Sequence, residues 1–188
     1  MPSRKRTKAV TLAGDRIVLR QFSKDDLPHT LRWYKDPEMR ELIGEAEPIT
    51  RAKAEKWYKG ICADKDRMWY AIVLKDGNRV VGEAGLLHMF RPWRSTDMTV
   101  IVGEKDAWGK GYGAEAGRLL LDLAFTKLGL HRVSIGVVSS NKRAMRYWKG
   151  LGFKKEGVQR DAHMWNGRYD DFVMMSILQE EYRSSHRE

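Results

Sequence analysis

The stretch that decides the fold is Val100-Ile-Val-Gly-Glu-Lys-Asp-Ala-Trp-Gly-Lys-Gly-Tyr-Gly-Ala-Glu-Ala116. An apolar strand pattern runs here into three glycines at alternate positions, Gly109, Gly111 and Gly113, and then directly into a helical pattern. Glycines let the backbone turn so that several N–H groups converge, and a helix N-terminus adds unpaired donors with a partial positive charge. The stretch predicts an anion site, for which a diphosphate is the natural ligand. The alternative is that the glycines only permit a tight strand-to-helix connection.

The spacing of these glycines excludes two common phosphate loops. The dinucleotide motif Gly-x-Gly-x-x-Gly would place a glycine at position 116, which is alanine, and the preceding strand is not the first of the chain. A Walker loop would need Lys-Ser or Lys-Thr after the glycines, and neither pair follows them. The loop is therefore of neither type.

The patterns on both sides of the loop predict an antiparallel meander followed by alternating strands and helices. Upstream we expect a strand at 16–22, helices at about 24–35 and 50–63, and strands at 68–74, 79–90 and about 95–102, the first two of these joined by the turn Asp76-Gly77-Asn78. Downstream we expect a helix at 113–128, a strand at 133–137, a helix at 141–150, and strands at 152–158, 161–165 and 169–178, with Asn166-Gly167 as a tight turn. This order predicts a mixed α/β (α+β) fold, in which helices flank a central, mostly antiparallel sheet.

Length and composition limit the class of protein. The 188 residues, 42% of them hydrophobic, suit one domain, which we place at 13–183, with a basic tail at 1–12 and a short C-terminal tail at 184–188. No uninterrupted apolar run reaches about 18 residues, so we expect a cytoplasmic protein with no membrane partner. Cys62 is the single cysteine and the five histidines show no ligand spacing, so we expect neither a disulfide nor a metal.

The charge balance favours an anionic partner. Lys and Arg number 35 against 25 Asp and Glu, giving a net charge of +10. Together with seven tryptophans that could stack on bases, this charge suggests a rival hypothesis, a basic nucleic-acid or ribosome-binding protein. Most tryptophans in a domain of this size are core or pocket residues, so we treat a nucleic-acid partner as the alternative.

A second group of residues follows the strand at 133–137. Asn141 is expected at the start of a helix, where its side chain can cap that helix or reach a bound ligand. Ala144, Trp148 and Leu151 share one face of the helix, a pattern typical of packing, and Tyr147 lies about 100° away around the axis.

Four segments together resemble the GNAT superfamily of acetyl-CoA-dependent N-acetyltransferases. They are Trp-Gly-Lys-Gly-Tyr-Gly-Ala-Glu-Ala at 108–116, Leu-Gly-Leu-His-Arg-Val at 128–133, Asn-Lys-Arg-Ala at 141–144 followed by Gly-Phe at 152–153, and Asn-Gly-Arg-Tyr-Asp-Asp at 166–171. They occur in family order, and the resemblance spans about 13–182. Trp33 and Asp36-Pro37 also match the branch that contains the ribosomal-protein-alanine and spermine/spermidine acetyltransferases.

The resemblance implies an acetyl-CoA site. It assigns the pyrophosphate loop Gln/Arg-x-x-Gly-x-Gly/Ala to 108–113, with Trp108 in place of the usual first residue, the pantetheine arm to the strand ending near Val102, and a contact with acetyl-CoA to Asn141. The cofactor-binding residues expected on this basis are Val100, Val102, Trp108, Gly109, Lys110, Gly111, Tyr112, Gly113, Ala114, Asn141, Ala144 and Trp148. Acetyl-CoA is expected as co-substrate.

The resemblance also raises the question of the catalytic acid. Family members commonly carry a tyrosine seven residues after the asparagine, and this position is Trp148, which has no acidic proton. Tyr147 is adjacent and is carried over as the candidate acid, although it should point elsewhere. Activity need not be lost, because a thiol with a pKa of about 8.5 is a reasonable leaving group and a general acid contributes about 10²- to 10⁴-fold.

The implied reaction is direct attack of a neutral amine on the acetyl thioester, so a base is needed. Glu83, in the central strand candidate, and Asp97, in the strand leading to the loop, are the candidates, with Glu104 as a third. Each could equally be an ordinary surface or salt-bridge carboxylate. The acidic group Glu41, Glu45 and Glu47 could attract a cationic substrate or simply form a solvated loop.

The sequence therefore predicts an N-acetyltransferase that transfers an acetyl group from acetyl-CoA to a polyamine, another small amine or a protein N-terminal amine. Its partners would be acetyl-CoA and the amine, in a monomer or homodimer. Besides the nucleic-acid-binding alternative, Trp148 leaves open a CoA-binding protein that has lost catalysis.

Overall fold

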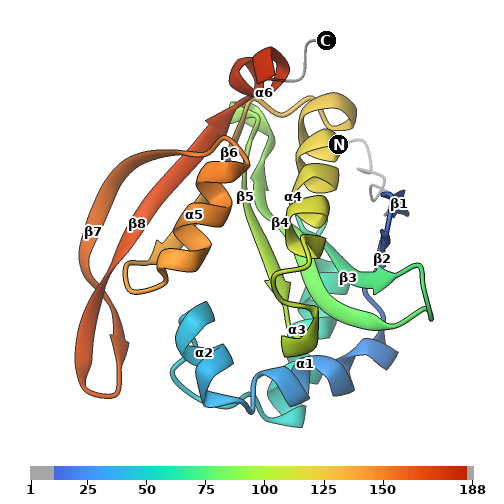
Figure 1. Ribbon diagram of the computed structural model, residues 1–188, viewed down its shortest axis with the longest axis vertical. Helices are drawn as coiled ribbons and strands as arrows, with labels where there is room; N and C mark the ends of the chain where they lie inside the picture. Colours follow the sequence, from blue (N-terminus) through green and yellow to red (C-terminus); the bar gives the residue numbers. More distant parts are fainter. Residues whose placement is uncertain (1–10, 186–188) are drawn as a thin grey trace.

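The computed structural model describes residues 11–185, and these form one eight-stranded mixed sheet with helices on both faces (Figure 1). The strands are β1 (Leu12–Ala13), β2 (Ile17–Gln21), β3 (Met68–Leu74), β4 (Val80–Phe90), β5 (Ser95–Val102), β6 (Arg132–Val138), β7 (Lys154–Trp165) and β8 (Arg168–Leu178). The helices are α1 (Leu27–Trp33), α2 (Pro37–Ile43), α3 (Arg51–Ala63), α4 (Tyr112–Asp122), α5 (Lys142–Gly150) and α6 (Gln179–Ser185). The predicted mixed and mostly antiparallel architecture is confirmed.

The sheet order is β1-β2-β3-β4-β5-β6-β8-β7, and the β5–β6 contact is the parallel one. That pairing covers only Ser95–Asp97 against Arg132–Ser134. Beyond Asp97 the described part of β5 stays paired with β4, whereas β6 continues along β8. The two central strands therefore separate toward their carboxyl ends and open the sheet in its middle.

Alternation along β3 divides the core into two layers. Tyr70 and Ile72 face the cluster that includes α4, whereas Trp69, Ala71 and Val73 face the cluster that includes α1 and α3. Successive strand residues point to opposite faces, so the fully buried run Met68–Val73 supplies apolar side chains to both layers. The opening between β5 and β6 consequently connects the two faces of the sheet.

Several elements differ from the prediction. A helix that was not expected lies between the predicted helices at 24–35 and 50–63: Asp36 caps α2 by accepting from the Glu38 N–H at 3.0 Å, with Pro37 as the first residue of α2. The expected helix at 24–35 is a 3₁₀ turn followed by α1, and the one at 113–128 is α4 followed by a π-helical turn at Leu123–Lys127. Helix α6 was not predicted.

Strand β7 is continuous, so the prediction of two strands at 152–158 and 161–165 was wrong. A register shift between Gln159 and His163, with Asp161 at a φ of 49°, bulges the strand without ending it. The turn Asn166-Gly167 is confirmed, with φ values of 48° and 74°, and it closes the long β7–β8 hairpin that extends to one side in Figure 1.

The two ends bear on the expected domain limits. Most of the basic tail lies outside the described residues, but Leu12 belongs to β1 and pairs with Leu19. At the other end α6 continues through Ser184 and Ser185, so regular structure extends past position 183. Within 11–185, no helix is long and apolar enough to cross a membrane.

Candidate active site

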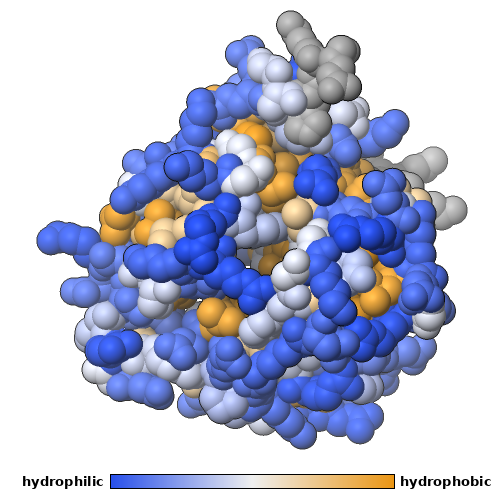
Figure 2. All heavy atoms as spheres, viewed as in Figure 1, coloured by the Kyte–Doolittle hydropathy of each residue, from blue (hydrophilic) through white to orange (hydrophobic). Residues whose placement is uncertain are grey.

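A cleft of about 620 Å³ occupies the opening between β5 and β6. In Figure 2 this face of the molecule is mostly hydrophilic, with apolar residues visible around a recess near its centre. The part of the cleft that we call the loop half is lined by Val100, Val102, Trp108, Gly109, Gly111, Tyr112, Gly113, Ala114, Asn141, Arg143, Ala144, Tyr147 and Trp148. The part that we call the aromatic half is lined by Tyr34, Met39, Leu42, Ile43, Glu45, Trp57, Trp69, Leu87 and Phe172.

The glycine loop has the geometry of an anion cradle. Gly109 and Gly111 have φ values of 75° and 82°, in the left-handed region that other residues rarely adopt. Gly111 is the N-cap of α4 and no side chain caps the helix, so the N–H groups of its first turn, Tyr112 to Ala114, point out of the helix end. A Cβ on Gly113 would lie 3.3 Å from Val102 Cγ2, so the glycine lets the loop approach β5 closely.

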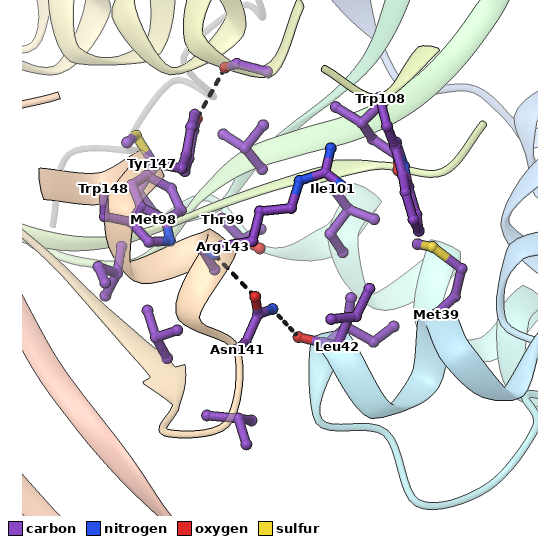
Figure 3. A pocket seen from close by; sticks show the side chains of 18 of the residues that line it. Met39, Leu42, Met98, Thr99, Ile101, Trp108, Asn141, Arg143, Tyr147 and Trp148 are labelled. Atoms are coloured by element: carbon purple, nitrogen blue, oxygen red, sulfur yellow. Dashed lines mark hydrogen bonds between the residues drawn. The ribbon is translucent and has the colours of Figure 1, made fainter. Parts of the chain in front are cut away.

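Trp108 ties the loop to the strand. Its indole N–H donates to the Val102 carbonyl at 2.7 Å, and the Arg143 guanidinium lies 4.7 Å from the centre of its ring (Figure 3). Sequence reasoning missed Arg143, which brings a positive charge from the first turn of α5 to the loop half.

Lys110 is the predicted loop residue that does not line the cleft. Its carbonyl accepts from Arg16 Nη1 at 2.8 Å, and Arg16 in turn bonds Glu115 on α4. The contact fastens the outer side of the loop to the residue just before β2, and the assignment of Lys110 to the cofactor site stays a prediction.

Both the oxygen and the nitrogen of the Asn141 side-chain amide form hydrogen bonds within the protein. Its oxygen accepts from the Ala144 N–H at 2.9 Å and caps α5, whereas its nitrogen donates to the Leu42 carbonyl at 2.9 Å on α2 (Figure 3). Of the two roles considered for this residue, the structure displays the cap, and it adds a link between α5 and α2. Because Asn141 also lines the cleft, it holds the two helices at the border between its halves.

Tyr147 and Trp148 both line the loop half, so the expectation that Tyr147 points away from the site was wrong. The Tyr147 hydroxyl donates to the Gly113 carbonyl at 2.9 Å, and burial raises the pKa of this phenol far above its usual range. A phenol in this state is a poor proton donor. Trp148 is buried against Tyr147 and Phe153, with ring centres 4.6 and 5.1 Å apart.

Glu83 lies fully buried beneath the aromatic half. Thr30 Oγ1 donates to its carboxylate at 2.9 Å and the Tyr34 hydroxyl at 3.3 Å. Burial raises the pKa of Glu83 to about 7, although Thr30, Trp69 and Tyr34 lie near enough to stabilise the charged form. Tyr34 itself lines the cleft, so its hydroxyl connects the solvent side to a carboxylate that titrates near neutral pH.

The other two candidate bases lie elsewhere. Asp97 is on the same strand face as Thr99 and Ile101 but at the far end of β5, where its carboxylate accepts from Ser134 Oγ at 2.7 Å and contacts His88 Nδ1 at 3.1 Å. It lines a separate cavity of about 300 Å³, so its assignment as a catalytic base is corrected. Glu104 accepts from the Trp33 indole at 2.7 Å and pairs with Arg32, and it does not line the cleft.

Comparisons with known proteins identify the family of this chain. The profile of the acetyltransferase (GNAT) domain matches residues 16–154. A spermidine N(1)-acetyltransferase of Vibrio cholerae is 31% identical over 180 residues, covering 90% of this chain and 96% of that protein. The N-acetyltransferase p20 of Bacillus licheniformis, itself uncharacterized, is 27% identical over 176 residues, covering 92% of this chain and 98% of that protein.

The fold is also that of a solved relative. The crystal structure of the Vibrio cholerae spermidine N-acetyltransferase in complex with CoA and spermine superposes with a TM-score of 0.84 at 24% identity, covering 90% of this chain and 99% of that one. With the domain profile covering most of the chain, and an uncapped glycine loop opening into a split sheet, the chain belongs to the GNAT family and is an acetyl-CoA-dependent N-acetyltransferase.

Proposed function

We propose that the protein transfers the acetyl group of acetyl-CoA to a primary amine, namely a polyamine, another small amine or a protein N-terminal amine, by direct attack. The proposal rests on one observation: an anion-binding helix end and a possible proton acceptor line the same cleft. The uncapped N-terminus of α4 opens into the loop half, and Tyr34, bonded to the buried Glu83, lines the aromatic half.

The residues of the loop half fit coenzyme A. The first-turn N–H groups of α4 suit a pyrophosphate, for which charge-assisted hydrogen bonds contribute roughly 1.5–3 kcal/mol each, and Arg143 adds a positive charge beside them. The edge of β5 that has left β6 lines the same half at Val100 and Val102 and suits an extended pantetheine arm, with the Val102 carbonyl already accepting from Trp108. When bound, acetyl-CoA supplies a thioester whose acetyl carbon bonds the amine nitrogen as its bond to sulfur breaks, which yields the acetamide and the CoA thiol.

Tyr34 and Glu83 provide the route for the amine proton. An alkylamine has a pKa of about 10.4, so generating its neutral form at pH 7 costs about 4–5 kcal/mol, and a base beside the acceptor provides a group that can receive the released proton. The Tyr34 hydroxyl can take a proton on its oxygen while it passes its own proton to Glu83. Because the pKa of Glu83 is raised to about 7, the carboxylate is a much better acceptor than an ordinary surface glutamate.

Neither Trp148 nor Tyr147 offers a comparable acid to the leaving thiolate. Trp148 has no acidic proton, and the Tyr147 hydroxyl is engaged with Gly113 in a setting that raises its pKa. We infer that the thiolate leaves unassisted and is protonated by solvent, which a thiol pKa of about 8.5 permits.

Release of free CoA in the presence of amines tests the function. With acetyl-CoA and a panel of polyamines, small monoamines and peptides with a free α-amine, we expect saturable thiol formation with at least one class, and the matching acetamide in the mass spectrum. Acetyl-CoA binding without release of thiol for any amine would indicate a CoA-binding protein that has lost catalysis. Absence of acetyl-CoA binding at millimolar concentration would reject the site itself.

Trp148→Tyr should leave turnover equal or raise it, because a tyrosine at this position of α5 lines the loop half and would offer a phenolic proton to the thiolate. Trp148→Phe is the matched control, since it removes the indole without adding a hydroxyl. We expect kcat to be higher for the tyrosine variant than for the phenylalanine variant at equal acetyl-CoA affinity. Equal kcat values for the two variants would show that an acid here contributes nothing.

A further inference from the structure

The aromatic half of the cleft is built around an edge-to-face pair of indoles. Trp57, from α3, and Trp69, from β3, have ring centres 5.3 Å apart with planes at 89°. Trp69 is fixed in place, because it is 7% exposed and lies so close to Gly85 that a Cβ there would be 2.5 Å from the ring. Trp57 is half-buried and Phe172 borders the same space from β8. Tyr34, the two indoles and Phe172 line the same cleft, so its aromatic half is bordered by flat apolar rings from three separate elements.

Charges are sparse in this half. Among the described residues that line the whole cleft, only Glu45 and Arg143 are charged at neutral pH, and Arg143 belongs to the loop half. Glu45 lies at the exposed rim, and Lys53 is close enough to offset part of its negative charge. Glu83 lies beneath and is already bonded to Thr30 and Tyr34. The aromatic half thus offers one rim carboxylate to an incoming cation.

This arrangement suits one positive charge better than several. Each ammonium that leaves water needs a compensating carboxylate or a set of hydrogen-bond acceptors, and a polyamine brings several ammonium groups. The net charge of +10 also disfavours a polycation at a distance. A single ammonium can be attracted by Glu45, lose its proton beside Tyr34 and leave an apolar body against the indoles.

We propose that the acceptor is a primary monoamine carrying an aromatic or bulky apolar group, because Trp57, Trp69 and Phe172 wall the acceptor space while Glu45 is its one lining carboxylate. This inference rests on the acetyl transfer proposed above. In the reaction, the ammonium gives one proton to Glu83 by way of Tyr34, and the neutral amine nitrogen then bonds the acetyl carbon as the carbon–sulfur bond breaks. The second nitrogen-bound proton passes through water to the thiolate of CoA. Spermidine, the substrate named for the Vibrio relative, would be a poor substrate here.

The test compares 2-phenylethylamine, n-butylamine, spermidine and a short alanyl peptide at saturating acetyl-CoA. Burial of the phenyl ring should give 2-phenylethylamine a kcat/KM about tenfold or more above that of n-butylamine, which has the same charge without the ring. We expect spermidine and the peptide to fall below 2-phenylethylamine as well. A higher kcat/KM for spermidine, for the peptide or for n-butylamine would overturn the proposal while leaving acetyl transfer intact. Thiol release with none of the four amines, despite acetyl-CoA binding, would count against both.

A variant separates the ring contact from general damage. Trp57→Leu should lower kcat/KM for 2-phenylethylamine about tenfold and that for n-butylamine less than threefold, with acetyl-CoA affinity unchanged because the loop half is untouched. Trp93→Leu is the matched control, since Trp93 is 76% exposed and lines the separate cavity, and it should change neither value. Equal losses for both amines in Trp57→Leu would overturn the assigned ring contact.

Discussion

Gly111→Glu is expected to weaken acetyl-CoA binding by at least about 100-fold. The glycine caps α4 at a φ of 82°, and the new carboxylate would lie at the helix end that is to receive the pyrophosphate. Loss of two charge-assisted hydrogen bonds, at roughly 1.5–3 kcal/mol each, corresponds to about 10²- to 10⁴-fold in Kd. Calorimetric titration with acetyl-CoA measures the loss directly.

Two controls separate this effect from backbone strain. Gly77→Glu introduces the same side chain at a φ of 69° in the β3–β4 turn, where no atom lies within 4 Å of the new Cβ, and acetyl-CoA affinity should be unchanged. Gly111→Ala introduces the strain of a side chain in the left-handed backbone conformation, about 1–2 kcal/mol, but adds no charge. It should therefore bind acetyl-CoA more tightly than Gly111→Glu does. A folded Gly111→Glu protein with full affinity would show that the loop does not hold the cofactor.

The loop could be predicted because its information is local. The spacing of Gly109, Gly111 and Gly113 between a strand pattern and a helix pattern determines where the backbone turns, and the structure has that turn in that place. The strand-helix order around it also gave the correct sheet class. The hydrogen bond from Arg16 to the Lys110 carbonyl shows the limit of local reasoning, since Arg16 is 94 residues away in the chain.

The aromatic half could not be predicted, because its walls come from distant segments. The rings that line this half come from four elements, the C-cap of α1 (Tyr34), α3 (Trp57), β3 (Trp69) and β8 (Phe172). The spacing of these residues in the sequence does not predict that they line one cleft. The role of Pro37 could not be predicted from the sequence either. A proline can mark the end of one helix or be the first residue of the next, and the cap made by Asp36 shows that Pro37 begins α2.

The alternation of residues along the strands likewise could not decide whether Glu83 or Asp97 lies in the cleft. Both point to the same face of the sheet, in adjacent antiparallel strands, and differ in which end of the strand they occupy. The position where β5 leaves β6 decides between them, and this position is a property of the tertiary structure.

Glu83→Gln is expected to lower kcat by about 10²- to 10⁴-fold with acetyl-CoA affinity unchanged, because the amide cannot accept the proton passed by Tyr34. In the unaltered protein, kcat/KM should rise with pH through an apparent pKa near 7, as Glu83 ionises, and this limb should disappear in the variant. Asp97→Asn makes the same chemical change on the same face of the sheet but outside the cleft, and it should leave kcat and the pH profile intact.

The stability of Glu83→Gln should change in the opposite direction to its activity. A carboxyl whose pKa is raised from 4.5 to about 7 on folding binds its proton more tightly in the native state, so the free energy of unfolding falls as pH rises from about 4.5 to about 7. That loss amounts to roughly 3 kcal/mol above pH 7, at 1.36 kcal/mol per unit of pKa, and the glutamine variant is free of it. Denaturant titrations at pH 4.5 and pH 8 should therefore show the variant gaining stability over the unaltered protein as pH rises. A variant that is inactive but more stable at pH 8 cannot owe its inactivity to misfolding, whereas one that keeps its rate would place the base elsewhere in the cleft.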